Sequence, residues 1–430
     1  MNCNVLQKNS SNSMKVPNSV LVEPYRLFFP LGWIAGIVGA SYWLLISTDL
    51  VSGYAPLYHG LIQIELFCSA FAVGFLLTAL PKFLRTRSAS VVELVVFLVV
   101  YLVLAGAILS NALIIGQWSF IAFLLLLIRF ALVRVNERKS TPPFSFYLIG
   151  FGLLEGLFGA LLIIFPLSAF PLLGEKLLEQ GMFLSLSLGV GSFLGPRLMR
   201  VVDTENAIVS LADRGSDNLS WYRSPSSVVF AIGILIFASF IVETGWNREV
   251  GLYIRGVVSL FCLARFNVLK VPRSPQVIGV LVAMALWTMP LGFFLAALFP
   301  SHEVAALHVT YIGGFGLLIL TIGAQVVSSH GVVHNFWQNH RAGALSIAVL
   351  ISLSVLFRLS VALFPSHYFF LIGVAAFAFN IAMLCWGFGV LRHIGSGAQF
   401  KENPSAFPST PPVTLPRIPP SESRATIKFE

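Results

Sequence analysis

Histidine is the residue type in this chain that is best suited to metal chemistry. The eight histidines divide between the two ends of the apolar segments that fill the sequence, and four of them share one end: His59, His302, His308 and His367. Neutral imidazole binds both haem iron and copper, so these four side chains could supply ligands to either metal. The alternative is that they are half-buried polar residues at the edge of a membrane.

Two arginines lie inside apolar segments, toward the same end as these four histidines. A charge is costly inside a membrane, so Arg255 and Arg358 should either face a partner anion or extend outward to the interface. The partner anion is either a protein carboxylate or an acidic ligand such as a haem propionate. Glu65 and Glu155, which lie deep inside apolar segments, are the candidates for the protein carboxylate.

The elements that must position these side chains are transmembrane helices. The chain is 57% hydrophobic and 10% charged, and its twelve apolar segments have about the length that crosses a bilayer. Hydrocarbon offers the backbone no hydrogen-bond partner, so each segment must be a helix. We therefore predict an all-α, polytopic membrane protein with twelve transmembrane helices, the seventh being the weakest. The predicted spans are residues 27–47, 60–80, 91–110, 112–133, 146–167, 177–199, 228–243, 251–269, 277–299, 304–327, 342–363 and 368–391.

The distribution of basic residues predicts the orientation of these spans. Of the 27 Lys and Arg residues, 21 lie in the two tails and in every second gap, whereas only Lys176 and Arg248 lie in the opposite gaps. Basic residues collect on the cytoplasmic side, so both termini are predicted to be cytoplasmic. The same topology places His59 and His308 near the outer face. The net charge of +9 follows from this topology and does not indicate nucleic-acid binding.

The rest of the composition adds no second folded domain. We expect a polar leader over residues 1–24, the transmembrane domain over 25–394 and a disordered, Pro/Ser-rich tail over 395–430. The four cysteines are scattered and offer neither a disulfide framework nor a zinc or iron–sulfur spacing. The glycine pairs Gly32/Gly36 and Gly152/Gly156 predict close helix packing.

Several motifs of the chain resemble the NnrS family. Tyr58-His59, followed by the block Gly-Phe-Leu-Leu-Thr-Ala-Leu-Pro at 74–81, is similar to the signature of the family's second span. Further similarities lie at residues 25–29, at Leu307-His308 with the glycines at 313 and 314, and at Ser329-His330-Gly331; together they cover most of residues 25–391. The resemblance implies a bacterial inner-membrane protein of twelve spans that is associated with haem and copper. It also implies a role in the response to nitric oxide during denitrification.

The chain departs from the family pattern at several positions. The family's second span opens with two histidines one residue apart; here His59 is kept and Leu61 replaces the second, with Glu65 as the nearest acid. A histidine of the family's ninth span is missing from residues 280–283, and an arginine expected before the His330 motif is Gln325. The chain therefore resembles a divergent member with fewer imidazoles.

From these observations we predict a haem or copper site near the outer face. His59 and His308 are the predicted ligands, Arg255 and Arg358 the predicted partners of an anionic cofactor group, and His330 the ligand of a second, cytoplasmic site. His308 and His330 flank one helix and are 22 residues apart, about 33 Å at 1.5 Å per residue, so they cannot share a metal. The expected ligand is nitric oxide or an iron–nitrosyl species.

Two other classes of membrane protein also have twelve spans, and a twelve-span secondary transporter of a small solute is the alternative prediction for this chain. A secondary transporter of the major facilitator type would carry an acidic and basic glycine motif between spans two and three, but residues 81–87 contain neither Asp nor Gly. A haem–copper oxidase subunit needs adjacent histidines, and no His-His pair occurs. A nucleophile elbow and a phosphate-binding glycine loop are also absent from the sequence, which leaves open whether the protein is an enzyme.

Overall fold

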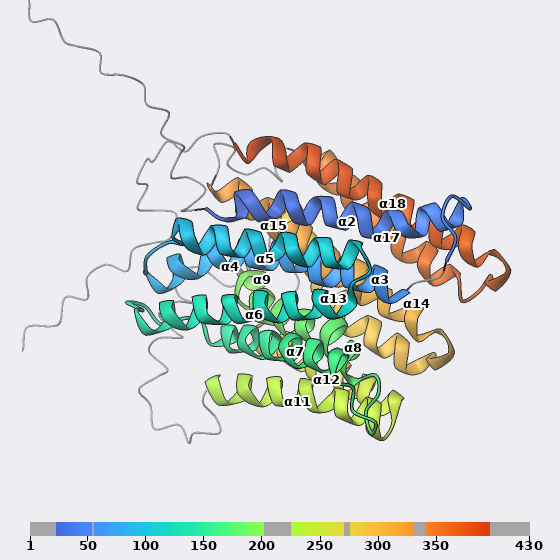
Figure 1. Ribbon diagram of the computed structural model, residues 1–430, viewed down its shortest axis with the longest axis horizontal. Helices are drawn as coiled ribbons and strands as arrows, with labels where there is room; N and C mark the ends of the chain where they lie inside the picture. The colour runs from blue at the N-terminus through green and yellow to red at the C-terminus, as the bar shows by residue number, and fades with distance from the viewer. Residues whose placement is uncertain (1–22, 54–55, 202–224, 271–275, 331–339, 396–430) are drawn as a thin grey trace, which may run out of the picture. The chain divides into compact units, whose positions relative to one another are not determined.

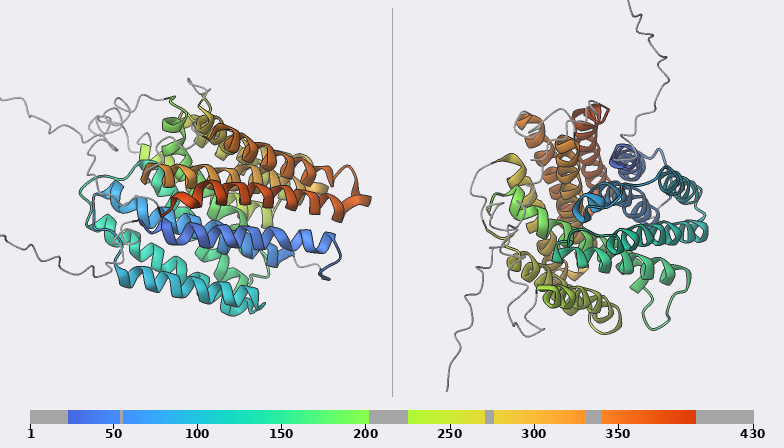
Figure 2. Two further views of the ribbon diagram at one scale, coloured as in Figure 1. Left: turned by 90° about the horizontal axis from the view of Figure 1, so that it is seen from above. Right: turned by 90° about the vertical axis from the view of Figure 1, so that its left-hand side faces the viewer.

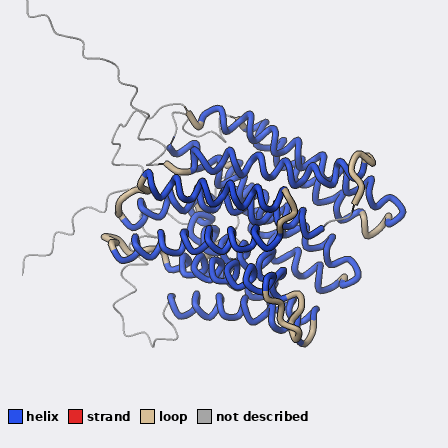
Figure 3. The backbone as a smooth tube through the Cα atoms, in the orientation of Figure 1, coloured by secondary structure: helices blue, strands red, loops and turns tan. Residues whose placement is uncertain are grey.

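The computed structural model, shown in Figure 1, describes residues 23–53, 56–201, 225–270, 276–330 and 340–395. Every regular element in these residues is a helix, as Figure 3 shows. The predicted leader and tail lie almost wholly outside the described residues. Nine helices run as α2 (Tyr25–Ser47), α5 (Val91–Leu109), α6 (Leu113–Asn136), α7 (Tyr147–Ile164), α11 (Pro225–Gly245), α12 (Arg248–Arg265), α13 (Val277–Leu298), α17 (Arg341–Ser360) and α18 (Tyr368–Val390).

Three further helices each consist of a short α-helix, a π-helical segment and a longer α-helix, and we call them the three central helices. The first is α3 (Pro56–Leu61), η1 (Ile62–Cys68) and α4 (Ser69–Leu84); the second is α8 (Leu173–Lys176), η3 (Leu177–Gly181) and α9 (Met182–Leu198); the third is α14 (Glu303–His308), η6 (Val309–Gly316) and α15 (Leu317–His330). In each, 78% of the most apolar stretch is buried, against 33% to 61% in the other spans. These helices therefore form the core of the bundle.

The prediction of an all-α, polytopic membrane protein is confirmed. In the described part of the chain, eleven helices are long and apolar enough to cross a membrane. The seventh predicted span, which looked the weakest, is one of these eleven, because the helix extends beyond the predicted ends to 225–245. The helix outside the eleven is α12, the eighth predicted span, whose charges include Arg248, Glu249, Arg255 and Arg265.

The twelve helices form three successive groups of four, and the groups are arranged alike. In each group the second helix is a central helix, the first packs against it, and the third and fourth pack as a hairpin: α5 with α6, α11 with α12, and α17 with α18. The fourth helix of each group packs against the first helix of the next, and α18 returns to α2. Figure 2 (right) shows the resulting ring, with the blue N-terminal helix α2 near the red C-terminal helix α18.

Local details support this threefold repeat. The first helices of groups one and two carry the same Gly-xxx-Gly-xx-Gly pattern, at Gly32/Gly36/Gly39 and Gly152/Gly156/Gly159. At each of these positions a Cβ would meet an atom of that group's central helix at or below 3.0 Å, so the predicted close packing is confirmed there. The first two central helices also end alike, with left-handed residues at Arg85 (φ 53°) and Arg200 (φ 52°).

Candidate metal site and its surroundings

His59 lies in α3, at the start of the first central helix. Its Nδ1 is 2.9 Å from the carbonyl oxygen of Gly39 on α2, and its ring packs edge-on against Trp43 at 5.6 Å. A carbonyl oxygen only accepts, so Nδ1 must carry the proton and donate it. In a neutral imidazole this leaves the lone pair of Nε2 for a metal, which is the usual arrangement of a histidine ligand.

His308 has the same tautomer for the same reason. It is the last residue of α14, and its Nδ1 donates to the carbonyl oxygen of Val304, one turn earlier, at 2.6 Å. Its ring packs against Tyr311 of η6 at 5.5 Å between centroids. The Nε2 lone pair of His308 is therefore also available to a metal.

The structure brings the two histidines together from the first and third central helices. His59 acts electrostatically on His308, and Arg358 of α17 acts on both imidazoles. The second central helix contributes Glu179 to the same region, since an oxygen of its carboxylate would be 2.6 Å from a Cβ built on Gly60. Three of the predicted site residues, His59, His308 and Arg358, therefore lie in one neighbourhood.

The other two histidines predicted for this face lie elsewhere. His302 and His367 end two short 3₁₀ turns with the same sequence, Phe-Pro-Ser-His, at 299–302 and 364–367, and both are exposed. Among the described residues, no group of three or more His, Cys, Asp or Glu side chains is arranged to hold a metal ion. The donor set that the structure offers is thus a pair of imidazoles, His59 and His308, each of which could bind haem iron or copper through Nε2.

Arg255, the fourth predicted residue, is held by protein groups. It forms an ion pair with Glu243, donates to Gln180 Oε1 at 2.7 Å and to Ser239 Oγ at 3.2 Å, and stacks on the ring of Phe240. The partner of Arg255 is therefore a protein carboxylate, which is one of the two kinds of partner anion predicted from the sequence. The ion-pair partner is Glu243 and neither of the two candidates: Glu65 accepts from Gln117 at 2.7 Å, and Glu155 lies beside Ser185, where Arg255 acts on it only at longer range.

The Arg255–Glu243 pair belongs to a larger cluster that we call the ion network. Its members are Lys176, Glu243, Arg248, Arg255 and Glu303, which come from α8, α11, α12 and α14. Lys176 Nζ lies 2.7 Å from Glu243 and 2.5 Å from Glu303, and Arg248 pairs with Glu303. The network adjoins the histidine region, because Tyr311 interacts electrostatically with Glu179, Glu303, Glu243 and Arg255.

His330 lies at the opposite end of the third central helix. Its Nδ1 is 2.8 Å from the carbonyl oxygen of Val326, and its ring packs on Tyr25 at 5.6 Å. Lys82 and Arg26 are close enough to act on it electrostatically. His330 is thus separate from His59 and His308, as the sequence spacing required.

Sequence reasoning missed Glu179, Tyr311 and the two acids of the ion network, Glu243 and Glu303. A signal was available for the acids, since Glu179 and Glu243 fall within predicted apolar spans, where a carboxylate is costly. Tyr311 gave no comparable signal, because tyrosine is common near the ends of membrane helices.

Comparison with known proteins supports the resemblance seen in the sequence. A comparison with curated proteins gave no match. The family described as NnrS protein matches residues 19–395, which include all twelve helices, the paired histidines His59 and His308, Arg358 and the ion network. This chain is a polytopic membrane protein that belongs to the NnrS family.

Proposed function

We propose that this protein binds haem or copper through His59 and His308 and acts in the response to nitric oxide, in the inner membrane of a bacterium. The observations that carry the proposal are that two imidazoles from different repeats lie within electrostatic range of each other and that each donates through Nδ1, so that Nε2 can bind a metal. Family membership supports a role related to nitric oxide. A bound metal would supply the coordination position for nitric oxide or an iron–nitrosyl species.

The protein groups around the two histidines have separate tasks in this proposal. Arg358 places a buried positive charge beside both imidazoles and would pair with an acidic group of the cofactor, such as a haem propionate. Arg255 already pairs with Glu243, so its contribution would be to hold the ion network that flanks the site. His330 has the same Nδ1-to-carbonyl arrangement and would be the ligand of the second metal.

The test is the optical spectrum and metal content of the purified, full-length protein. His59→Ala and His308→Ala should each lose most of the bound haem or copper, because each removes one of two ligands. His302→Ala is a matched control, since this exposed histidine of the same face should be dispensable. A wild-type protein without metal, or variants that retain all of it, would contradict the proposal.

The two arginines give a second, finer test of the same site. Arg358→Gln should loosen cofactor retention without preventing membrane insertion, because it removes the charge beside the imidazoles. Arg255→Gln should change retention less, because Glu243 keeps Lys176 as its partner. Full retention of the cofactor in both variants would show that neither arginine belongs to the site.

A further inference from the structure

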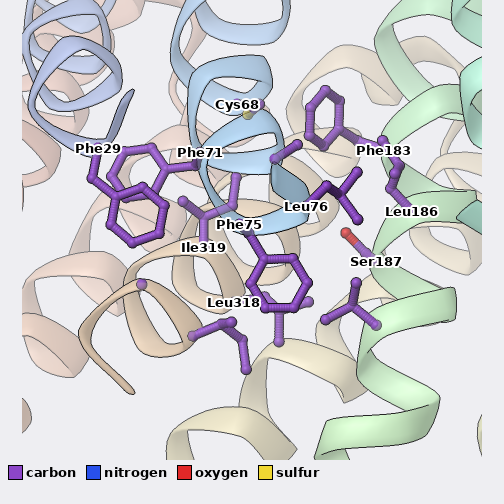
Figure 4. A pocket seen from close by; sticks show the side chains of 14 residues that line it. Phe29, Cys68, Phe71, Phe75, Leu76, Phe183, Leu186, Ser187, Leu318 and Ile319 are labelled. Carbon is purple, nitrogen blue, oxygen red and sulfur yellow. The ribbon is translucent and has the colours of Figure 1, made fainter. Parts of the chain in front are cut away.

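A cavity of about 70 Å³ lies where the three central helices meet. The first helix lines it with residues that include Cys68 and Phe71, the second with Phe183 and Ser187, and the third with Ile322; α2 adds the ring of Phe29. Figure 4 shows the aromatic rings and aliphatic side chains around the space. The cavity therefore sits at the axis of the threefold repeat, inside the apolar part of the bundle.

The local sequence helps to explain why the helices leave a space here. Ala72 presents only a methyl group toward it from the first central helix, while Gly323 lets the third central helix approach closely, since a Cβ there would be 3.1 Å from the ring of Phe71. The cavity also begins where the π-helical segments end, at Cys68 in the first central helix and just beyond Gly181 and Gly316 in the others. The changes of helical pitch disturb regular side-chain packing at this level.

The chemistry of the lining favours an apolar occupant. Almost all of the lining is hydrocarbon, and the polar groups are one thiol, of Cys68, and one hydroxyl, of Ser187, which Figure 4 shows turned toward the space. A water molecule needs two to four polar partners to occupy a buried site, whereas apolar cavities stay dry and accept xenon or small hydrocarbons. By volume the space is about five times the minimum for one water, so a diatomic gas fits.

The cavity lies directly along the helices that carry the proposed ligands. Cys68 is nine residues after His59, and Leu318 is ten residues after His308. At the α-helical rise of 1.5 Å per residue each interval would span at most about 15 Å, and the π-helical segments within them shorten it. A gas that dissolves in the bilayer would thus meet an apolar site within the same bundle, on the helices that carry the proposed ligands.

We propose that this cavity is a binding site for a small apolar gas and that nitric oxide is its physiological occupant. The choice of nitric oxide rests on the proposed function, whereas the existence of a gas site rests on the volume and lining of the cavity alone. Binding requires no reaction: the gas fills space and gains contacts with the surrounding rings and methyl groups.

The test measures xenon binding to the full-length protein in nanodiscs, and the chemical shift of dissolved xenon reports the binding. Wild type should bind xenon saturably, and nitric oxide should displace it. Ser187→Leu places three extra carbons in the cavity and should weaken xenon binding by about tenfold or more. Ser119→Leu is the matched control, because Ser119 is half-exposed on α6 and bonds only to the carbonyl oxygen of Ile115 on its own helix; it should bind as wild type does.

Ala72→Leu fills the same space from another helix and keeps the test valid if Ser187→Leu does not fold. No xenon binding in wild type, xenon binding as strong as that of wild type in both cavity variants, or xenon that nitric oxide fails to displace would each overturn the proposal. These readouts need no metal, so a protein that binds xenon but lacks haem and copper would contradict the proposed function and leave the gas site standing.

Discussion

At the scale of single residues, the hydrogen bonds of the buried pair Glu65 and Gln117 indicate whether the Glu65 carboxyl carries a proton. Gln117 Nε2 donates to Glu65 Oε1 at 2.7 Å, while Glu65 Oε2 and Gln117 Oε1 are both buried acceptors without a donor. A proton on Glu65 Oε2 would make that carboxyl a donor and allow a second hydrogen bond to the amide. We therefore expect Glu65 to be a neutral carboxylic acid.

This assignment can be checked by substitution and by infrared spectroscopy. Glu65→Gln keeps one donor and one acceptor facing Gln117 and should change stability by less than about 1 kcal/mol, whereas Glu65→Leu strands the Gln117 amide and should cost about 1–3 kcal/mol. Thermal unfolding in detergent measures both. The carboxylic C=O band of wild type should disappear in Glu65→Gln; a carboxylate band in its place would refute the assignment.

The sequence predicted some of these residues and not others, for a physical reason. Acids and arginines inside apolar segments are visible in the sequence because burial makes them costly, which is why Glu65, Arg255 and Arg358 were identified. Their partners were not predictable, because Gln117 and Glu243 lie on other helices, and pairing depends on how those helices meet. The prediction that His59 and His308 share a site came from the resemblance and from their similar depth, since the way in which the first and third central helices meet cannot be read from the sequence.

At the scale of elements, α12 depends on its neighbours for its place in the bundle. It is not among the helices that are apolar enough to span on composition alone, and the charge it buries, Arg255, is neutralised by Glu243 of α11. Its end was also misjudged: it stops at Arg265 rather than near Leu269, because Asn267 adopts a left-handed conformation (φ 60°). The Asn is a recognisable stop signal in the sequence.

The Arg255–Glu243 pair allows a prediction about this helix. Glu243→Ala leaves Arg255 buried without its carboxylate and should destabilise the protein by about 3–5 kcal/mol, the usual cost of removing one partner of a buried pair. Combining it with Arg255→Met should recover much of this loss, since no charge is then stranded. Thermal unfolding of the two single variants and the double variant forms the cycle. Additive losses would show that the pair does not stabilise α12.

At the scale of the whole molecule, the spans were visible from composition but the threefold repeat was not. The three groups share few identical residues. Two motifs do recur, the Phe-Pro-Ser-His turn and the Gly-xxx-Gly-xx-Gly pattern, but they indicate a repeat only once the structure shows that their helices occupy equivalent places. The π-helical segments were not predicted either, although two of them contain Glu and Gln side chains among their apolar residues. Three groups of four also differ from the two six-helix halves of a major facilitator transporter.

The orientation of the bundle in the membrane is predicted from the distribution of its basic residues, and reporter fusions measure it. Reporter fusions after Lys139 should give cytoplasmic activity, and fusions near Ser52 and Ser301 should report the outside. This outcome would place His59 and His308 toward the outer face. An outside signal after Lys139 would reverse every side assignment while leaving the contacts between residues unchanged.

The closure of the ring also determines when folding can be completed during biosynthesis, because the first helix packs against the last one. The first helix, α2, ends at Ser47, but the helix that covers its flank, α18, begins at Tyr368, 321 positions later. At about 5–20 residues per second, a ribosome needs roughly 15–65 s to cover that interval. During this time the flank of α2 must be sheltered by lipid or by the insertion machinery, so the protein can complete its native packing only after its last helix has entered the membrane.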